Sequence, residues 1–234
     1  MLLAAGRGER MRPLTDHTPK PLLPVQGRAL LDWHIAALLR DGVAQVLVNT
    51  AWLGAHIAQH LDATWRGSPL QLRYSHEQDD FGHALETAGG IARALPQLPP
   101  VFWLAAGDVF VPDFVFDPAA HAAFAASDHL AHLWLVPNPA HNPQGDFGLA
   151  AGRALNLPAD SPMPRYTYST IGLFKAALFS APWCALDPGN PTGQAAPLAP
   201  LLRRAMDAGR VGASLYTGRW TDVGTPQRWA ELQQ

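Results

Sequence analysis

The sequence has almost no cysteine and no long hydrophobic run, and both shortages limit what the protein can be. Its one cysteine, Cys184, excludes an intrachain disulfide and gives no sign of an oxidising compartment. No stretch of the 234 residues is apolar for long enough to cross a bilayer. The apolar start, Met1–Ala5, is too short for the hydrophobic region of a signal peptide. We therefore expect a cytoplasmic location.

The sequence also lacks an excess of basic residues. Lys and Arg number 17 against 19 Asp and Glu, which gives a net charge of -2, and no run of basic residues occurs. Nucleic acids and membrane surfaces usually require concentrated positive charge, so neither is expected as a partner. With 48% hydrophobic residues, the chain is long enough to bury a substantial core as one large domain, 1–234.

Hydrophobic periodicity predicts alternating strands and helices in the first half of the chain. Such alternation favours an α/β fold with a doubly wound, mostly parallel sheet that helices cover on both faces. Ligands of such sheets bind at the carboxyl ends of the strands. The predicted strands are 46–48, 70–74 and 101–105, and the predicted helices are 30–40, 53–61 and 86–95.

The second half of the chain has a different pattern, with a Pro-rich loop and shorter strands. The predicted elements are a helix at 118–126, a strand at 130–136, an extended segment at 165–174 and a helix at 198–208. Thr225 and Pro226 form a good N-cap and first-position pair for a terminal helix.

A glycine-containing loop, Ala5-Gly6-Arg7-Gly8-Glu9-Arg10, follows the first strand after only a few residues. A small-residue turn after a strand lets backbone N–H groups approach phosphate oxygens closely, as triphosphate binding requires. Met11 stands where a dinucleotide fingerprint needs a third glycine, and no Walker A motif occurs. The first strand is also unusually short, so we expect that the chain start is placed a few residues too late.

Lys20 stands between two prolines and, with Lys175, is one of only two lysines among the 17 basic residues. The flanking prolines restrict the backbone and would hold a point charge in a fixed place against a phosphate. Arg10 can supply a second positive charge. The alternative is that Lys20 is a solvated loop residue.

Two aspartates are predicted near the carboxyl ends of strands. Asp108 follows the apolar run 101–106 and Gly107, and Asp222 lies in Trp220-Thr221-Asp222-Val223-Gly224. Mg²⁺ typically takes one or two carboxylates and fills its other positions with phosphate oxygens and water, so this pair could hold one ion. Alone, each aspartate could equally be a turn or capping residue.

Together these motifs resemble the signature of sugar-1-phosphate nucleotidyltransferases, L-A-A-G-x-G-x-R-M/L-x-P-L-T followed by P-K-P-L/M. Residues 3–15 and 19–22 match nearly every position. The resemblance implies a Rossmann-like fold with a sugar-binding insertion in the second half. It also implies that Ala5, Gly6, Gly8 and Glu9 bind the nucleoside triphosphate with Arg10 and Lys20, and that Asp108 and Asp222 bind Mg²⁺.

The resemblance further implies transfer of a nucleotidyl group to a sugar 1-phosphate, with release of pyrophosphate. Lys20, Arg10 and Asp108 are then the expected catalytic residues, acting by positioning and charge stabilisation rather than as nucleophiles. Residues 1–112 would mainly bind the nucleotide and residues 113–234 mainly the sugar. We expect UTP and a sugar 1-phosphate as small-molecule partners, and a monomer or weak homodimer.

Leu85-Glu86-Thr87-Ala88-Gly89-Gly90 resembles the family segment L-E-T-G-G-G, where backbone and threonine contacts read the nucleobase. Glu86, Thr87 and Gly89 are therefore predicted to contact uracil. The glycines could instead serve only tight helix packing.

The sugar is indicated by the second half of the chain. Asn138-Pro139-Ala140-His141 and Gly145-Asp146-Phe147 are similar to elements of uridylyltransferases that act on N-acetylmuramate 1-phosphate, and the E-K-P element of mannose and glucose enzymes is missing. Gly145, Asp146 and Ser169 are predicted to contact the sugar, although Asp146 could be a turn residue.

Some positions depart from the family pattern. Ala106 replaces an asparagine before Gly107-Asp108, Ser169-Thr170-Ile171 replaces S-G-I, and residues 79–82 lengthen a loop. Two alternatives therefore stay open. One is a related transferase that uses dTTP, GTP or CTP, with choline phosphate as a further acceptor, and the other is a non-catalytic nucleotide-binding module.

Overall fold

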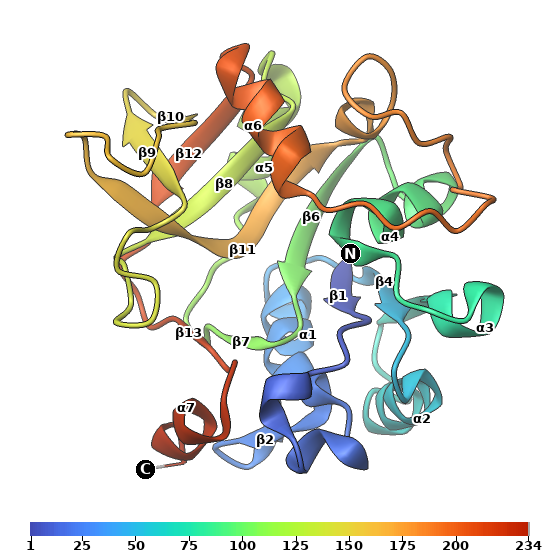
Figure 1. Ribbon diagram of the computed structural model, residues 1–234. Coiled ribbons are helices and arrows are strands. Elements are labelled where there is room, and N and C mark those ends of the chain that lie inside the picture. The colour runs from blue at the N-terminus through green and yellow to red at the C-terminus, as the bar shows by residue number, and fades with distance from the viewer. Residues whose placement is uncertain (234) are drawn as a thin grey trace.

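One nine-stranded sheet joins both halves of the chain in the computed structural model, which describes residues 1–233 (Figure 1). Its strand order is β5-β4-β1-β6-β11-β8-β12-β10-β9. The strands of the sheet are β1 (Leu2–Ala4), β4 (Gln45–Thr50), β5 (Gln71–His76), β6 (Val101–Ala106), β8 (Ala131–Val136), β9 (Phe147–Ala150), β10 (Arg153–Leu155), β11 (Arg165–Lys175) and β12 (Val211–Leu215).

The first half of the chain forms the parallel part of the sheet. β4 pairs in parallel with β5 and β1, and β1 pairs in parallel with β6, with Leu2 opposite Val48 on one side and Ala105 on the other. The crossover helices are α1 (Leu30–Arg40), α2 (Gly54–Thr64) and α4 (Glu86–Ala94). The predicted α/β class is confirmed, and the predicted helix over residues 30–40 has the expected bounds.

The second half adds mostly antiparallel strands to the same sheet. β11 lies antiparallel to both β6 and β8, and only β12 and β8 pair in parallel there. The predicted helix α5 (Pro118–Ala126) is confirmed, and α6 (Ala199–Asp207) falls within its predicted range. Thr225 caps the terminal helix α7 (Pro226–Glu231) by accepting a hydrogen bond from Arg228 N. The sequence patterns do not indicate several short elements. They are the hairpin of β2 (Pro24–Val25) and β3 (Arg28–Ala29), the paired strands β7 (Val109–Phe110) and β13 (Thr221–Asp222), and helix α3 (Glu77–Phe81).

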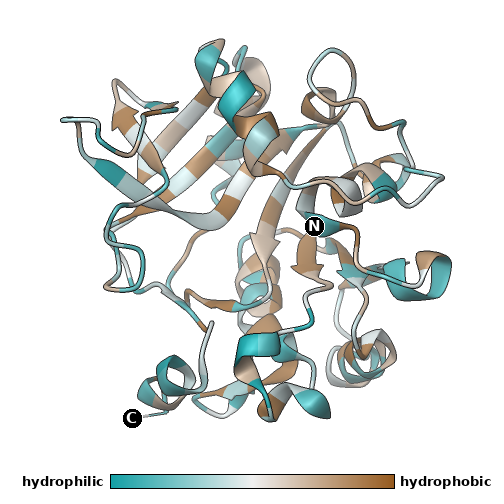
Figure 2. Cartoon of the chain, viewed as in Figure 1, coloured by the Kyte–Doolittle hydropathy of each residue, from teal (hydrophilic) through white to brown (hydrophobic). Residues whose placement is uncertain are grey.

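Helices cover both faces of the sheet. One core cluster packs α1, α2 and Phe124 of α5 against the face that carries Trp103 and Ala105. A second cluster packs α4 and α6 against the opposite face, which carries Phe102 and Leu104. Alternate residues of β6 therefore point into two separate cores, which explains why residues 101–106 form a continuous apolar run. Figure 2 shows the same arrangement as hydrophobic strands between helices with polar outer sides.

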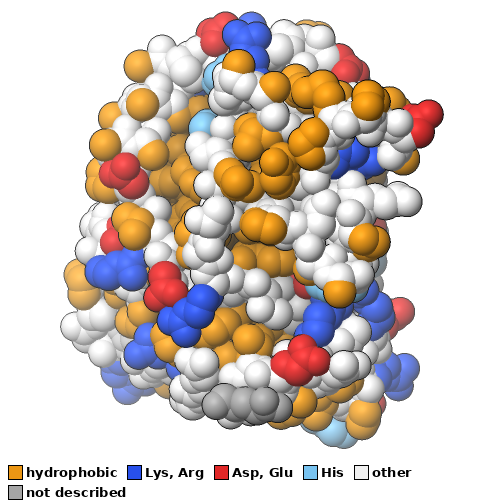
Figure 3. All heavy atoms as spheres, turned by 90° about the vertical axis from the view of Figure 1, so that its left-hand side faces the viewer, with side chains coloured by type: hydrophobic (Ala, Val, Ile, Leu, Met, Phe, Trp, Pro, Cys, Tyr) orange, Lys and Arg blue, Asp and Glu red, His pale blue; other side chains and the backbone are white. Residues whose placement is uncertain are grey.

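The surface carries charges of both signs close together. On the face turned to the viewer in Figure 3, acidic and basic side chains are mixed among hydrophobic ones. Among residues 1–233, every helix is too short or too polar to span a membrane.

The candidate functional residues lie where the parallel strands end. β1, β4, β5 and β6 all terminate at one edge of the sheet, where they lead into the glycine loop, Ala51, Glu77 and Gly107. The small β7–β13 ladder lies next to this edge, with Asp222 opposite Val109 and Val223 N donating to Asp108 O at 2.9 Å. The β7–β13 ladder brings residues that are more than a hundred positions apart in sequence to one place.

Candidate active site

Three adjoining cavities open at the carboxyl edge of the parallel strands. The first, here the loop cavity, has a volume of about 350 Å³. The second, here the cation cavity, has about 330 Å³, and the third, here the bulge cavity, has about 390 Å³. The loop cavity is lined by Leu3, Ala4, Ala5, Gly6, Lys20, Pro21, Asn49, Ala84, Glu86, Thr87, Ala106 and Asp108. The cation cavity is lined by Gly6, Gly8, Glu9, Arg10, Met11, Lys20, Asp108 and Gly224.

The cavities share lining residues, so they lie next to one another. Lys20, Asp108 and Gly6 line both the loop and the cation cavity. Glu86, Thr87, Leu3 and Ala106 line both the loop and the bulge cavity. Nine of the residues that the sequence predicts for nucleotide binding and catalysis therefore line adjoining cavities: Ala5, Gly6, Gly8, Glu9, Arg10, Lys20, Glu86, Thr87 and Asp108.

Gly8 fixes the shape of the glycine loop. It has a left-handed backbone with φ 68°, and a Cβ at this position would lie 3.1 Å from Thr15 Cγ2 and 3.2 Å from Lys20 Cβ. Its carbonyl accepts hydrogen bonds from Met11 N at 2.9 Å and Thr15 Oγ1 at 2.8 Å. Glycine is needed here for both conformation and space, and its absence of a side chain lets Lys20 lie directly against the loop.

Lys20 and Asp108 form an ion pair in the wall between two cavities. Lys20 Nζ donates to Asp108 Oδ2 at 2.5 Å, and the Lys20 side chain is 10% exposed against 40% for Asp108. The prolines on either side of Lys20 begin a short 3₁₀ turn, Lys20–Leu22, that directs the side chain inward. Lys20 is therefore buried, in contrast to the alternative of a solvated loop lysine.

Asp222 lies beside Asp108 through the backbone, but its side chain points to another group of residues. Asp222 Oδ1 contacts Arg228 Nη1 and lies 2.7 Å from His141 Nε2. His141 belongs to the Asn138–His141 element that the sequence links to the sugar. This contact across the molecule is not predictable from motif spacing, because it depends on how α7 folds back onto β13.

The two aspartates fit a divalent cation by their donor chemistry. Both are carboxylates carried by neighbouring, hydrogen-bonded backbone segments, and each is neutralised by a cation of the protein. Within residues 1–233, no group of three or more His, Cys, Asp or Glu side chains forms a ready-made metal site. Two carboxylates suit Mg²⁺, which binds through one or two carboxylates together with substrate phosphates, better than they suit a structural metal.

A buried polar network that the motif analysis missed positions the segment before Glu86. Asn49 Oδ1 accepts from Ala4 N at 3.0 Å, and Asn49 Nδ2 donates to Glu77 Oε1 at 2.7 Å. Glu77 Oε2 accepts from Leu85 N at 2.8 Å. Burial raises the pKa of the Glu77 carboxyl, while Leu85 N–H and Asn49 oppose this rise. The network ties the ends of β1, β4 and β5 to the start of α4, where Glu86 has φ 60°.

Gly89 lies inside α4 rather than in a cavity wall. A Cβ on Gly89 would be 2.6 Å from Gln194 O, and one on Gly90 would be 2.5 Å from Glu77 Oε1. The backbone N–H of Gly89 donates to Ala196 O at 3.1 Å. Close packing therefore accounts for both glycines. The prediction that Gly89 contacts the base stays a prediction.

The bulge cavity lies beside an irregularity in β11. Its walls contain Leu3, Glu86, Thr87, Leu104, Ala106, Asp146, Phe147, Tyr168, Thr170, Pro197, Leu198, Ala199, Leu202 and Arg203. Arg203 is the one cation among these lining residues. Its Nη1 donates to Asn156 Oδ1 at 2.6 Å, and its guanidinium carbon lies 5.2 Å from the centre of the Phe147 ring.

The three residues predicted to contact the sugar have different environments. Asp146 lines the bulge cavity, and its Oδ2 accepts from Tyr168 N at 2.8 Å. Gly145 and Ser169 line none of the three cavities. Ser169 is 1% exposed, and its Oγ accepts from Ile171 N at 3.2 Å inside β11. Sequence reasoning missed Tyr168 and Arg203, because nothing in the local pattern marks either as facing a cavity.

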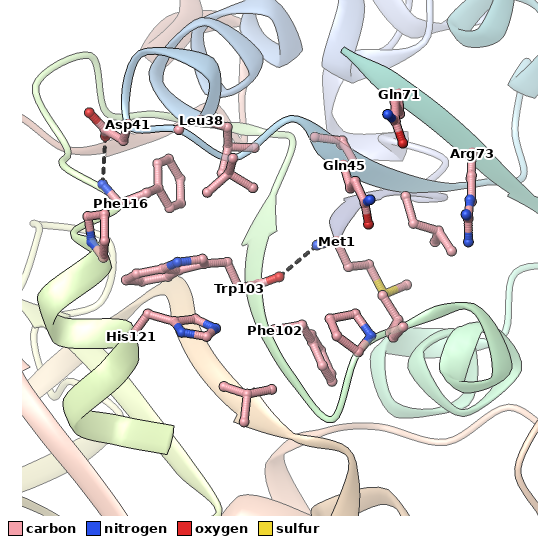
Figure 4. Close-up of a pocket in the computed structure, with 18 of the residues that line it drawn as sticks. Met1, Leu38, Asp41, Gln45, Gln71, Arg73, Phe102, Trp103, Phe116 and His121 are labelled. Atoms are coloured by element: carbon pink, nitrogen blue, oxygen red, sulfur yellow. Dashed lines mark hydrogen bonds between the residues drawn. The ribbon is translucent and has the colours of Figure 1, made fainter. Parts of the chain in front are cut away.

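A further cavity, of about 330 Å³, lies at the amino ends of the same strands (Figure 4). β1 is shorter than β4 and β6, so Gln45 and Phe102 extend past it, and the Met1 amino group donates to Trp103 O at 2.7 Å. Burial lowers the pKa of this amino group to about 5. The glycine loop and Asp108 lie at the opposite ends of these strands, so this cavity is separate from the candidate active site.

Comparisons with known proteins agree with this geometry. A family model described as nucleotidyl transferase matches residues 1–154. An N-acetylmuramate alpha-1-phosphate uridylyltransferase from Neisseria meningitidis serogroup B is 43% identical over the whole chain and 96% of its own length. A protein of the same name from Caulobacter vibrioides is 30% identical, over 97% of this chain and 92% of its own length.

Solved structures share the fold at low sequence identity. A Bacillus anthracis protein described as a glucose-1-phosphate thymidylyltransferase superposes with a TM-score of 0.80 at 17% identity, covering 99% of this chain and 92% of its own. An inositol-1-phosphate CTP transferase from T. maritima gives a TM-score of 0.73 at 16% identity, covering 100% of this chain and 95% of its own. The fold, the loop and the matched family model agree, and the chain belongs to the nucleotidyl transferase family of sugar-phosphate nucleotidyltransferases.

Proposed function

We propose that this protein transfers UMP from UTP to N-acetylmuramate α-1-phosphate, giving UDP-N-acetylmuramate and pyrophosphate. One observation carries the proposal: three adjoining cavities are lined by the glycine loop, Lys20, Asp108, the Glu86–Thr87 segment and Asp146. These are the groups that a triphosphate, its metal and a sugar phosphate require. UTP is a cytoplasmic metabolite, so the proposal includes a cytoplasmic location, and we propose a monomer or weak homodimer.

The reaction needs no nucleophile from the protein. A phosphate oxygen of the sugar 1-phosphate attacks the α-phosphorus of UTP, a new P–O bond forms, and the bond to the β-phosphate oxygen breaks as pyrophosphate leaves. Both reactants are anions, so the protein must reduce their repulsion and stabilise the charge that builds up on the leaving group. Lys20, Arg10, Gly6 and Gly8 line the cavity where these phosphates would lie.

The family generally uses a divalent metal, and we propose Mg²⁺ held by Asp108 and Asp222. A bound Mg²⁺ would supply positive charge against the phosphates of the nucleotide. The protein's own part is to keep the two backbone segments that carry these aspartates next to each other, which the bond from Val223 N to Asp108 O supports. Lys20 pairs with Asp108 and Arg228 pairs with Asp222, so neither acid is an unpaired charge.

The choice of sugar rests on charge in the bulge cavity. N-acetylmuramate carries a lactyl carboxylate that glucose, mannose and N-acetylglucosamine lack. Arg203, the one cation among the lining residues, would pair with that carboxylate, and Arg is well suited to do so because its planar guanidinium can donate two parallel hydrogen bonds. The names of both full-length relatives support the same substrate.

A pyrophosphate-release assay with Mg²⁺ tests the proposal directly. Each of UTP, dTTP, GTP and CTP is paired with the 1-phosphates of N-acetylmuramate, N-acetylglucosamine and glucose, and with choline phosphate. The expected result is the highest kcat/KM for UTP with N-acetylmuramate 1-phosphate, with UDP-N-acetylmuramate identified by mass. A different preferred pair would reject the proposed substrates while keeping the reaction class. No release with any pair would favour a non-catalytic nucleotide-binding module.

A further inference from the structure

Thr170 has a backbone conformation that its side chain disfavours. Its φ is 65°, in the left-handed region, and the pairing of β11 with β8 shifts register between Tyr168 and Gly172 around it. Five other non-glycine residues within 1–233 share a positive φ, but none of them is β-branched. A β-branched residue in this region is a genuine outlier, because its Cβ substituents crowd the backbone. Such strain persists where neighbouring structure enforces it, often at ligand sites.

The bulge around Thr170 is held by specific hydrogen bonds on both sides. Ser169 O accepts from Trp220 Nε1 at 3.0 Å and from Thr170 Oγ1 at 2.5 Å. Ser169 Oγ accepts from Ile171 N at 3.2 Å, and Asp146 Oδ2 accepts from Tyr168 N at 2.8 Å. The strained segment is therefore rigid. It is attached through Trp220 to the strand that carries Asp222, and through Asp146 to the wall of the bulge cavity.

Thr170 lines the bulge cavity at the point where β11 shifts register. A bulge commonly re-aims a side chain in this way. The hydroxyl hydrogen of Thr170 is used by Ser169 O, so the oxygen faces a ligand only as an acceptor. The Cβ and the methyl group occupy space that glycine, the residue best suited to this backbone, would leave empty. Thr170 therefore offers an acceptor and an apolar wall at one fixed point.

We propose that Thr170 is a specificity-determining residue of the sugar half-site, and this rests on the proposed function. Its oxygen accepts a hydrogen bond from a hydroxyl or acetamido N–H group of the sugar, and its methyl group limits which sugars fit between Asp146 and Arg203. Thr170 lines the bulge cavity together with Asp146 and Arg203 and is absent from the walls of the loop and cation cavities, so we expect it to act on the sugar and not on the phosphates of UTP.

The test compares Thr170→Gly with Ala151→Gly as a matched control. Ala151 also has a positive φ, 50°, but lies in the exposed turn between β9 and β10. Thermal unfolding without ligands should show a Tm rise of about 2–4 °C for Thr170→Gly, because strain is relieved. In the same variant, the ratio of kcat/KM for N-acetylmuramate 1-phosphate to that for glucose 1-phosphate should fall about tenfold. The KM for UTP should stay unchanged, and Ala151→Gly should keep the wild-type ratio.

Two further variants separate the effect of the Thr170 hydroxyl from the effect of the backbone strain. Thr170→Ala keeps the strained conformation and loses the acceptor, so it should lose discrimination without the Tm rise. Thr170→Ser keeps the acceptor and should retain most of the discrimination. An unchanged substrate ratio in Thr170→Gly, or an unchanged Tm, would overturn the proposal.

Failure of this proposal can be distinguished from failure of the proposed function. The Tm comparison does not depend on activity. If the wild-type protein prefers another sugar 1-phosphate, the proposed substrate is wrong, and the same ratio is then measured for the preferred sugar against glucose 1-phosphate. A ratio that still does not respond to Thr170→Gly rejects Thr170 as a specificity residue whichever sugar is preferred.

Discussion

Replacing Lys20 with methionine separates catalysis from folding more clearly than any other single change in this protein. Methionine is similar in length to the lysine stem and can keep the packing against the glycine loop, where Lys20 Cβ would lie only 3.2 Å from a Cβ at Gly8. The charge alone is removed. Lys20→Met therefore tests whether the ammonium group stabilises the reacting phosphates.

The expected cost to activity is large and the expected cost to stability is small. Removing one preorganised donor from a site where charge develops lowers kcat by about 10²–10³-fold, or about 3–4 kcal/mol. Among residues 1–233, the hydrogen-bond partner of Lys20 Nζ is Asp108, whose side chain is 40% exposed. A partly exposed ion pair of this kind stabilises folding by at most about 1 kcal/mol after screening by solvent.

Initial-rate kinetics of pyrophosphate release and thermal unfolding measure the two effects separately. Lys175→Met is the matched control, because Lys175 is the only other lysine in the sequence. It donates to Ser127 O at 2.5 Å and lies 5.5 Å from the Phe124 ring, and it lines none of the three active-site cavities. Lys175→Met should keep the wild-type kcat. The reasoning about Lys20 is refuted if Lys20→Met retains more than about a third of the wild-type kcat, or if its Tm falls by more than about 5 °C.

Further predictions concern the metal, the sugar and pH. Asp108→Asn and Asp222→Asn should each lower kcat about 10²-fold or more with little change in circular dichroism, and near-wild-type turnover in either would remove that residue from the proposed metal site. Arg203→Gln should raise the KM for N-acetylmuramate 1-phosphate about tenfold or more and leave kcat/KM for N-acetylglucosamine 1-phosphate nearly unchanged, with Arg204→Gln as the neighbouring control. Burial lowers the pKa of His34 from 6.5 to about 4, so the unfolded chain takes up a proton in this window that the folded protein does not. His34 should therefore contribute a fall of about 2 kcal/mol in the free energy of unfolding between pH 7 and pH 5, so in urea titrations the fall should be smaller by about this amount in His34→Gln than in the wild-type protein.

Elements with a strong local pattern could be predicted from the sequence. The helix at 30–40 has the expected bounds because its apolar residues recur at helical spacing and Gly42 follows. The helix at 118–126 begins where Asp117 caps it and Pro118 fits its first turn. Both signals lie within a dozen residues, so no knowledge of distant contacts is needed.

Short or irregular elements could not be predicted in the same way. The β7–β13 ladder has two residues on each side, and its pairing depends on segments more than a hundred residues apart. Helix α3 is formed by residues 77–81, where the sequence indicates only a lengthened loop. Its Asp80 pairs with Arg93 of α4 at 2.7 Å, and a Cβ on Gly193 would lie 2.3 Å from Phe81 Cδ1, so distant contacts surround it.

The candidate site likewise contains residues that a local pattern predicts and residues that only distant contacts bring together. The groups proposed to bind the triphosphate, from Gly6 to Lys20, lie in one continuous motif, whereas Asp108 and Asp222 lie far from it in the sequence. The groups proposed for sugar recognition come from the residue before β9, from β11 and from α6, and all three line the bulge cavity. Local pattern therefore indicates the reaction and the elements similar to those of related enzymes, whereas the contribution of Arg203 depends on long-range packing.

Ala106 illustrates how a departure from the family pattern acquires a different meaning in the structure. From the sequence alone, Ala106 indicates the loss of the polar contact that an asparagine at this position would make. In the folded protein, Ala106 lies at the end of β6 and lines both the loop cavity and the bulge cavity. A larger side chain there would stand between the two spaces, while Asn49 already supplies a polar wall to the loop cavity. Ala106 therefore leaves room where the two cavities share a wall, and the loss of the asparagine does not leave the loop cavity without a polar wall.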